Sequence, residues 1–145
     1  MFEDFYLDIE LLDKNAKMPT RAYSSDAGCD VYAPEKVTIF PGRDALIPLG
    51  WRCKFPEGYA LVFFNKSGVS TKKKLDIGAC CIDSQYRGIV HVHLFNTGER
   101  PVTLEKGDKI AQFLVFPVWT GVPFEKKVEI DSERGEDGFG STDKK

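Results

Sequence analysis

Asp83 is the acidic side chain of this sequence that is best placed to act on a water molecule. It begins the segment Asp83-Ser84-Gln85-Tyr86-Arg87-Gly88, which lies between Cys80-Cys81-Ile82 and an apolar run over Ile89–Phe95. This order predicts a hairpin-like bend that gathers an acid, a tyrosine and an arginine. An aspartate at such a bend either turns the chain or orients and deprotonates a water as a general base.

A second group of polar residues, Lys66-Ser67-Gly68-Val69-Ser70, follows the apolar run Tyr59–Phe64. A cation, a hydroxyl and a glycine at the end of a strand can form a phosphate cradle, because glycine lets backbone N–H groups close on phosphate oxygens. Such a short match is common, so it is weak by itself. The lysines at 72–74 are typical of a solvated face.

Other candidate ligands are less specific. The segment Asp26-Ala27-Gly28-Cys29-Asp30-Val31-Tyr32 enters a strand after a loop, and its acids either help to hold a metal or cap a turn, the turn being favoured. His91 and His93 are the only histidines and lie two residues apart, hence on one face of a strand. Two ligands without a third make a poor metal site, so an interface or structural role is favoured. No histidine pairs with a serine or cysteine in a way that supports nucleophilic catalysis.

The C-terminal segment differs in composition from the rest. From Asp131 onward it is polar and rich in glycine, with one aromatic residue, Phe139. Such a segment buries too little apolar surface to order itself, and most termini are frayed. However, glycines and hydroxyls can wrap a phosphate, and one aromatic ring can stack on a base. Arg134-Gly135 to Thr142 looks superficially like a P-loop, but it has no Gly-Lys-Ser/Thr step and no helix after it, which excludes a P-loop NTPase.

The elements that position these residues are predicted to be strands. Runs rich in Val, Ile, Phe and Tyr are separated by Pro-Gly and Asn-Thr-Gly turns, and any helix is short. A small β-barrel or jelly-roll sandwich is the expected class. The predicted strands cover Phe5–Leu12, Lys36–Phe40, Ala45–Leu49, Tyr59–Phe64, Gly88–Phe95, Val102–Leu104 and Ile110–Val118.

Composition narrows the classes of protein. The 145 residues fit one domain, and 42% hydrophobic and 29% charged residues are typical of a soluble protein. A formal net charge of −2 gives no reason to expect nucleic acid or a membrane as partner. The acidic start lacks the pattern of a secretory signal, and no run is apolar enough to cross a bilayer, so we expect a cytoplasmic protein. The four cysteines, at 29, 53, 80 and 81, form no Cys-x-x-Cys pair and are expected to be reduced core thiols.

Taken in order, the motifs resemble those of the homotrimeric dUTPase family over nearly the whole chain, from about residue 18 to 142. Three segments carry most of the resemblance. They are Ile82-Asp83-x-x-Tyr86-Arg87-Gly88 with Leu94-Phe95-Asn96, then Gly107-Asp108-Lys109-Ile110-Ala111-Gln112, and then Arg134-Gly135-x-x-Gly138-Phe139-Gly140-Ser141-Thr142.

This resemblance implies a jelly-roll β-barrel over residues 1–130 and a flexible C-terminal arm over residues 131–145. The barrel would assemble as a trimer with shared active sites. The implied reaction is hydrolysis of dUTP to dUMP and pyrophosphate by in-line attack of water on the α-phosphorus, with Mg²⁺ as cofactor. It would control dUTP and supply dUMP for thymidylate synthesis.

The resemblance also implies a role for individual residues. Asp83 would orient the attacking water with Gln112, and Tyr86 would lie under the deoxyribose and exclude a 2′-hydroxyl. Backbone groups of a hairpin over Gly78, Ala79 and Ile82 would contact uracil, and Asp30 would meet magnesium through water. Phosphates would be held by Lys66, Ser67, Gly68 and Gln112. The arm would close with Phe139 on uracil and with Arg134, Gly140, Ser141 and Thr142 around the γ-phosphate.

Some positions depart from the family pattern. Lys66 stands where the family has an arginine, so the planar guanidinium group is replaced by a point charge. Cys80-Cys81 replaces Gly-Val. Cys29 and Asp137 replace a tyrosine and a glycine.

Two rival functions stay open. A dCTP deaminase shares the fold, but it needs an acid to activate water against the base ring, and only Asp83 suits that. The second rival is a binding protein that has the same fold but no catalytic activity.

Overall fold

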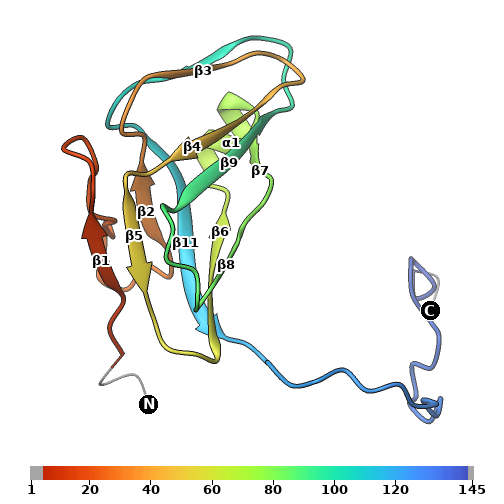
Figure 1. Cartoon of the computed structure of the whole chain (residues 1–145). Coiled ribbons are helices and arrows are strands. Elements are labelled where there is room, and N and C mark those ends of the chain that lie inside the picture. The colour runs from red at the N-terminus through yellow and green to blue at the C-terminus, as the bar shows by residue number, and fades with distance from the viewer. Residues whose placement is uncertain (1–4, 144–145) are drawn as a thin grey trace.

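The computed structural model describes residues 5–143 and has an all-β, jelly-roll-like fold with one short helix (Figure 1), as predicted. The seven predicted strands are present with slightly different ends. The strands are β1 (Asp8–Leu11), β2 (Cys29–Tyr32), β3 (Val37–Ile39), β4 (Asp44–Pro48), β5 (Trp51–Lys54), β6 (Tyr59–Phe64), β7 (Leu75–Ile77), β8 (Cys81–Asp83), β9 (His91–Asn96), β10 (Val102–Leu104) and β11 (Lys109–Pro117), and α1 spans Ser67–Lys73.

Short elements escaped the sequence analysis. β5 alternates buried Trp51 and Cys53 with exposed Arg52 and Lys54, which is the period of a half-buried strand but over only four residues. Helix α1 buries only Val69 and ends at Lys74, whose left-handed conformation (φ 59°) closes the last turn by an N–H bond to the carbonyl of Val69. A helix with one buried residue has no apolar period that a sequence can display.

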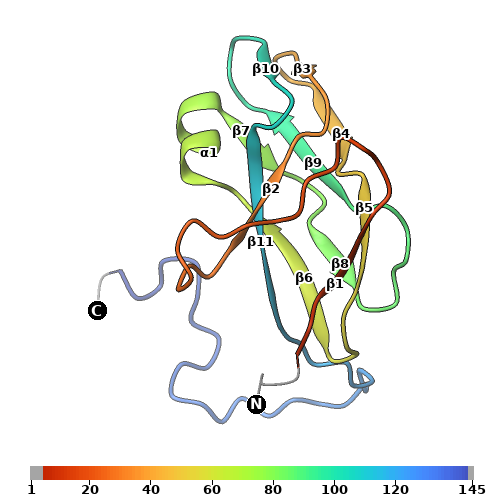
Figure 2. The same cartoon turned by 90° about the vertical axis from the view of Figure 1, so that its left-hand side faces the viewer.

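The strands form antiparallel sheets that share one core (Figure 2). A four-stranded sheet has the order β2-β11-β6-β8, and a three-stranded sheet has the order β4-β9-β7. Two further pairs, β1 with β5 and β10 with β3, complete the barrel. In the core, Phe63 packs edge-on against its register partner Phe113 at 6.0 Å between ring centroids, and Trp51 lies 6.3 Å from the same ring.

The segment around Asp83 differs from its prediction. A hairpin-like bend would pair the strands on its two sides, but β8 pairs with β6 whereas β9 pairs with β4 and β7. The hairpin expected over residues 78–82 is wrong for the same reason, because β7 and β8 belong to different sheets. Residues 78–80 form a loop that crosses from one sheet to the other.

Strand β9 shows how the barrel sorts its side chains. Val92, Leu94 and Asn96 are buried, whereas His91, His93 and Phe95 lie on the outer face. The fully buried Asn96 amide is satisfied, since its Nδ2 donates to the carbonyls of Ile39 and Arg100 at 2.9 and 2.8 Å.

The chain leaves the barrel after β11. The N–H of Val118 donates to the carbonyl of Gly58 at 2.9 Å, and the described residues beyond it form no helix or strand. This C-terminal segment runs away from the barrel (Figure 1). Its large apolar side chains are exposed: Trp119, Val122, Phe124, Val128, Ile130 and Phe139. The domain boundary at residue 130 stays a prediction.

The cysteines are unpaired, as expected, but they are not all core thiols. Only Cys53 is buried, and Cys81 is exposed. Cys80 is partly buried in the loop that crosses between the sheets, and Cys81 begins β8, the edge strand of its sheet.

Candidate functional site

Strand β8 places Asp83 at the rim of a hollow of about 220 Å³. Ile82 is opposite Leu61 on β6, and Asp83, at the end of the strand, is opposite Ala60. The side chain of Ile82 packs toward the core while Asp83 is exposed. The structure thus brings four predicted residues around one hollow, which is lined by Leu46, Ala79, Cys80, Cys81, Ile82, Asp83, Tyr86 and His91.

Tyr86 is fixed at this hollow by three contacts. Its N–H donates to the carbonyl of Asp83 at 3.0 Å, and its hydroxyl donates to the carbonyl of Ile89 at 2.8 Å. The ring lies against Gly88, where an added Cβ would be only 2.4 Å from the Tyr86 hydroxyl. Any larger residue at 88 would displace the ring, so the Tyr-Arg-Gly order has a steric reason.

The loop at 78–80 uses part of its backbone inside the chain. The Gly78 N–H donates to the carbonyl of His93 at 3.0 Å, and the Ala79 N–H donates to Nδ1 of the same histidine at 2.9 Å. On the other side, the carbonyl of Cys80 accepts from the N–H of Phe63 on β6. The predicted uracil contacts therefore cannot use the N–H groups of Gly78 and Ala79 in this conformation, and must come from other backbone groups of residues 78–82.

Asp30 on β2 lies in a second cluster. Its side chain is 7% exposed, and its two oxygens are paired with different lysines, Oδ1 with Lys66 and Oδ2 with Lys109 at 3.1 Å. Burial raises the pKa of Asp30, but the hydrogen bonds and charges of the two lysines outweigh burial, so the pKa is lowered overall. The carboxylate is therefore ionised at neutral pH and compensated by two cations.

Gln112 belongs to the same cluster. On β11 it is opposite Asp30 of β2 and Phe64 of β6. Its Nε2 donates to the carbonyl of Asn65 at 2.9 Å, and its Oε1 lies where a Cβ on Gly28 would approach to 2.2 Å. The glycine at 28 is thus required for the amide to occupy this position.

Ser67 and Gly68 are exposed at the start of α1, directly after Lys66.

Two residues of this cluster were not singled out by the sequence analysis. For Lys109 the available signal is its position in the Gly107-Asp108-Lys109 segment, which carries part of the family resemblance. Asn65 gave no signal, since its role is to accept the N–H of Ile77 at 2.8 Å and to hold Gln112 through its carbonyl.

The two clusters are well separated within one chain. Asp83 is opposite Ala60, whereas Gln112 is opposite Phe64, so the two residues flank β6 four positions apart. At about 3.3 Å per residue this corresponds to about 13 Å along the strand. The predicted water-orienting pair is therefore not brought together by a single chain.

The predicted arm residues form a third group. Arg134 Nε donates to the carbonyl of Asp137 at 2.9 Å within the segment, and Phe139 is fully exposed. Figure 1 shows this segment far from β8 and β11. Gly140, Ser141 and Thr142 belong to the same terminal turns.

The described residues contain no cluster of three or more His, Cys, Asp or Glu side chains that could hold a metal ion. Each oxygen of Asp30 is paired with a lysine, and its predicted contact with magnesium through bound water stays a prediction. Mg²⁺ is usually bound through one or two carboxylates and the phosphates of a substrate. The protein side chains of one chain alone therefore do not fit a resident magnesium site.

Cysteine chemistry is disfavoured at the hollow. Desolvation, with the nearby Asp83 and Cys80, raises the pKa of Cys81 at the hollow, and burial raises the pKa of Cys53, which lies away from the hollow, to about 11. These thiols are protonated at neutral pH, and a thiol in that state is a poor nucleophile. The Nδ1–H of His91 donates to the carbonyl of Ile89 at 2.8 Å, and not to a thiol or hydroxyl.

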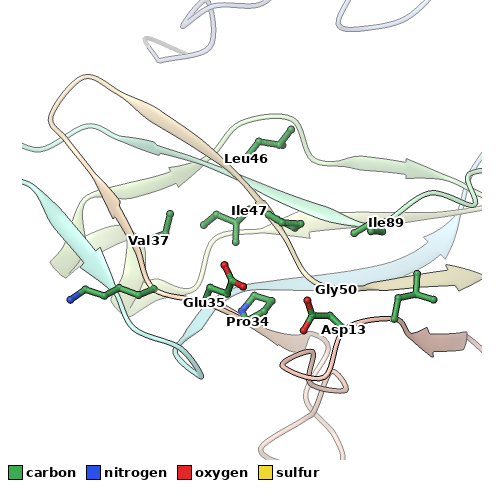
Figure 3. Close-up of a pocket in the computed structure, with 11 residues that line it drawn as sticks. Asp13, Pro34, Glu35, Val37, Leu46, Ile47, Gly50 and Ile89 are labelled. Carbon is green, nitrogen blue, oxygen red and sulfur yellow. The ribbon is translucent and has the colours of Figure 1, made fainter.

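Another hollow, of about 330 Å³, lies beside β4 (Figure 3). Its walls are mostly apolar, with Val37, Ile47 and Ile89 among them, and Asp13 and Glu35 as its acids. It contains none of the predicted site residues. The candidate site is therefore the hollow at the end of β8, because of the side chains that line it and not because of its volume.

No helix among residues 5–143 is long and apolar enough to span a membrane.

Comparison with known proteins agrees with this geometry. The profile of the dUTPase family matches residues 14–143. A deoxyuridine 5′-triphosphate nucleotidohydrolase of Clostridium tetani is 37% identical over 143 residues, which cover 97% of this chain and 99% of that protein. The mitochondrial human protein of the same name is 37% identical over 133 residues, covering 92% of this chain and 53% of its own length.

Solved structures lead to the same family. A point mutant of the dUTPase of Staphylococcus bacteriophage 80alpha, determined with dUpNHpp, superposes with a TM-score of 0.87 at 32% identity, covering 94% of this chain and 98% of the phage protein. A mutant dUTPase of phage phi11 of S. aureus, described with a structural Mg(II) ion, has a TM-score of 0.77 at 30% identity, covering 88% and 99%. With its motifs, its barrel and its relatives in agreement, this chain belongs to the dUTPase family.

Proposed function

We propose that this protein hydrolyses dUTP to dUMP and pyrophosphate, and so controls dUTP and supplies dUMP for thymidylate synthesis. The observation that carries the proposal is the hollow at the end of β8, where an exposed carboxylate, Asp83, lies beside the fixed ring of Tyr86 and the 78–80 loop. These are the parts that a deoxynucleotide needs: a group for water, a surface for the sugar and a polar edge for the base. Relatives over almost the whole chain are named for this activity.

The reaction requires positioning more than covalent chemistry. Asp83 accepts a proton from a water molecule, whose oxygen attacks the α-phosphorus in line with the bridging oxygen to the β-phosphorus. That bond breaks, and pyrophosphate leaves with the bridging oxygen. An exposed carboxylate at the rim of the hollow can take this proton without a change in the fold.

The triphosphate is assigned to the second cluster. Lys66 with Ser67 and Gly68 offers a cation, a hydroxyl and an exposed backbone at the end of β6, and Gln112 lies beside them. Lys66 and Lys109 have one shared carboxylate between them, so the cluster carries one excess positive charge. Such an excess attracts phosphate oxygens.

The arm supplies the remaining contacts. Phe139 stacks on the base, and Arg134, Gly140, Ser141 and Thr142 surround the terminal phosphate. The complete exposure of Phe139 supports this assignment, because an apolar ring in solvent gains free energy when a base covers it.

The site is proposed to be shared among subunits of a homotrimer. Within one chain Asp83 and Gln112 are separated along β6, and the arm lies away from both. The segment between the barrel and the arm exposes Trp119, Phe124 and Ile130, at 75%, 85% and 67%. A second copy of the chain covers such side chains and at the same time brings a foreign cluster to the hollow.

Magnesium enters the proposal only together with the triphosphate. No cluster among the described residues holds the ion directly, and the residue that we propose to approach it is Asp30, through bound water. Removal of divalent ions with a chelator should abolish turnover of dUTP but leave the thermal stability of the ligand-free protein unchanged.

The direct test is a measurement of pyrophosphate release with dUTP, UTP, dCTP and dTTP side by side. We expect turnover of dUTP only. Release of ammonia from dCTP would instead identify a deaminase on the same fold. Binding of dUTP without any product would identify a silent binding module.

A further inference from the structure

His93 is held between the 78–80 loop and the neighbouring strand β4. Its ring is 26% exposed on the outer face of the β4-β9-β7 sheet. Nδ1 accepts the N–H of Ala79 at 2.9 Å, and Nε2 lies 2.8 Å from Oδ2 of Asp44 on β4.

These partners define the tautomer of the ring. A backbone N–H can only donate, so Nδ1 must be the acceptor and carry no proton. Nε2 then carries the proton and donates it to the Asp44 carboxylate. This hydrogen bond lowers the pKa of Asp44, which keeps the carboxylate ionised as an acceptor.

The contact with the loop is close as well as polar. The carbonyl of His93 accepts the N–H of Gly78, so one residue binds two successive N–H groups of the loop. A Cβ at position 78 would lie 2.1 Å from Nδ1 of His93, so only glycine lets the loop approach the ring. The next residues of the loop, Ala79 and Cys80, line the hollow that we assign to the nucleotide.

We propose that His93 is a positioning residue for base recognition, which holds the 78–80 loop in its base-binding conformation through the hydrogen bond from Ala79 to Nδ1. Asp44 fixes the tautomer and the orientation of the ring. This inference rests on the proposed function of the hollow. It gives His93 a role in the affinity for the nucleotide and none in the chemical step.

Two substitutions test separately the contacts made by the two ring nitrogens of His93. In His93→Asn, Oδ1 takes the place of Nδ1 and still accepts from Ala79, while the contact with Asp44 is lost. In His93→Gln, the terminal amide reaches Asp44, but no acceptor remains for Ala79. Both replacements are polar and smaller than histidine, so each is the control for the other.

We expect the KM for dUTP to rise about three- to tenfold in His93→Gln, the effect of losing one hydrogen bond. The kcat should stay within about twofold of the original value, because the interaction is the same in ground and transition states. Hydrogen exchange at residues 78–80 should be faster in His93→Gln and unchanged in His93→Asn, in the ligand-free protein. His93→Asn should have the original KM.

Several outcomes would overturn the proposal. One is an unchanged KM and unchanged exchange in His93→Gln, and another is an equal rise of KM in both variants. A fall in kcat together with a lower melting temperature would make His93 an ordinary structural residue. If the unmodified protein did not hydrolyse dUTP at all, the proposed function would fail, but the exchange measurement would still decide whether His93 holds the loop.

Discussion

Asp83 combines exposure with a fixed backbone position at the end of β8. Exposure leaves its oxygens available to water, and the pairing of β8 with β6 fixes the backbone from which the side chain extends. We predict that Asp83→Asn still binds nucleotide but turns over dUTP about a hundred to ten thousand times more slowly, because an amide can hydrogen-bond the water but cannot take its proton. Isothermal titration with a non-hydrolysable analogue and pyrophosphate release measure the two properties. Near-normal turnover would show that another group is the base.

The proposed role of Tyr86 is selectivity for the sugar, since two neighbouring contacts hold its ring at the hollow. Its hydroxyl is held by the carbonyl of Ile89, and Gly88 lies against the ring. We predict that turnover of UTP is far below that of dUTP, and that Tyr86→Ala narrows this difference. Tyr86→Phe is the control, since it keeps the ring and loses only the hydroxyl. The ratio of kcat/KM for the two substrates is the measurement, and an unchanged ratio in Tyr86→Ala would place the discrimination elsewhere.

Asp30 links stability to pH. Its folded pKa lies below the unfolded value, so its contribution is present above the unfolded pKa of about 3.9 and is lost as the pH falls through the lower folded value. We predict that Asp30→Asn lowers the stability by about 1–3 kcal/mol at pH 7, because two lysines lose a shared, nearly buried partner. The difference between the two proteins in denaturant unfolding should shrink below about pH 4. A difference independent of pH would mean that packing, not charge, is responsible.

At the scale of elements, the C-terminal segment is the part of the chain that packs least. The Nε of Arg134 donates to the carbonyl of Asp137 within the segment, and Phe139 is fully exposed. We predict that a chain ending at Ser132 melts within about 2 °C of the full chain and binds dUMP equally well, but hydrolyses dUTP far more slowly. Calorimetry and steady-state kinetics measure these properties.

Phe139→Ala separates the contributions of the arm. Stacking of an aromatic ring on a base is worth about 1–3 kcal/mol, so a large loss of rate supports stacking on uracil. A small loss assigns the effect to the phosphate contacts. An intact hydrolysis rate in the shortened chain would make the segment a frayed end, and unfolding of that chain would make it structural.

At the scale of the whole molecule, we predict a homotrimer. Light scattering should give about three times the chain mass of 16.3 kDa.

Mixed trimers test the shared site. Asp83→Asn chains and Gln112→Ala chains, each inactive alone, are mixed and reassembled. About a quarter of the shared sites should then contain both original residues. Activity recovered on mixing therefore supports sites built from different subunits. A fully active monomer would contradict the prediction.

The sequence by itself determined the strand-rich fold and the family, because alternating apolar residues and fixed motifs are local in the chain. It also identified Asp83, Tyr86 and Gln112 as candidates, since their motifs lie within a few residues. Only the tertiary structure revealed that β8 and β9 lie in different sheets, that Asp30 is shared by Lys66 and Lys109, and that His93 binds the 78–80 loop. These facts depend on strand order, register and the outward face of β9, which bring together residues far apart in the chain. Residue types and spacing show which face of a strand is buried, but not which distant strand it pairs with.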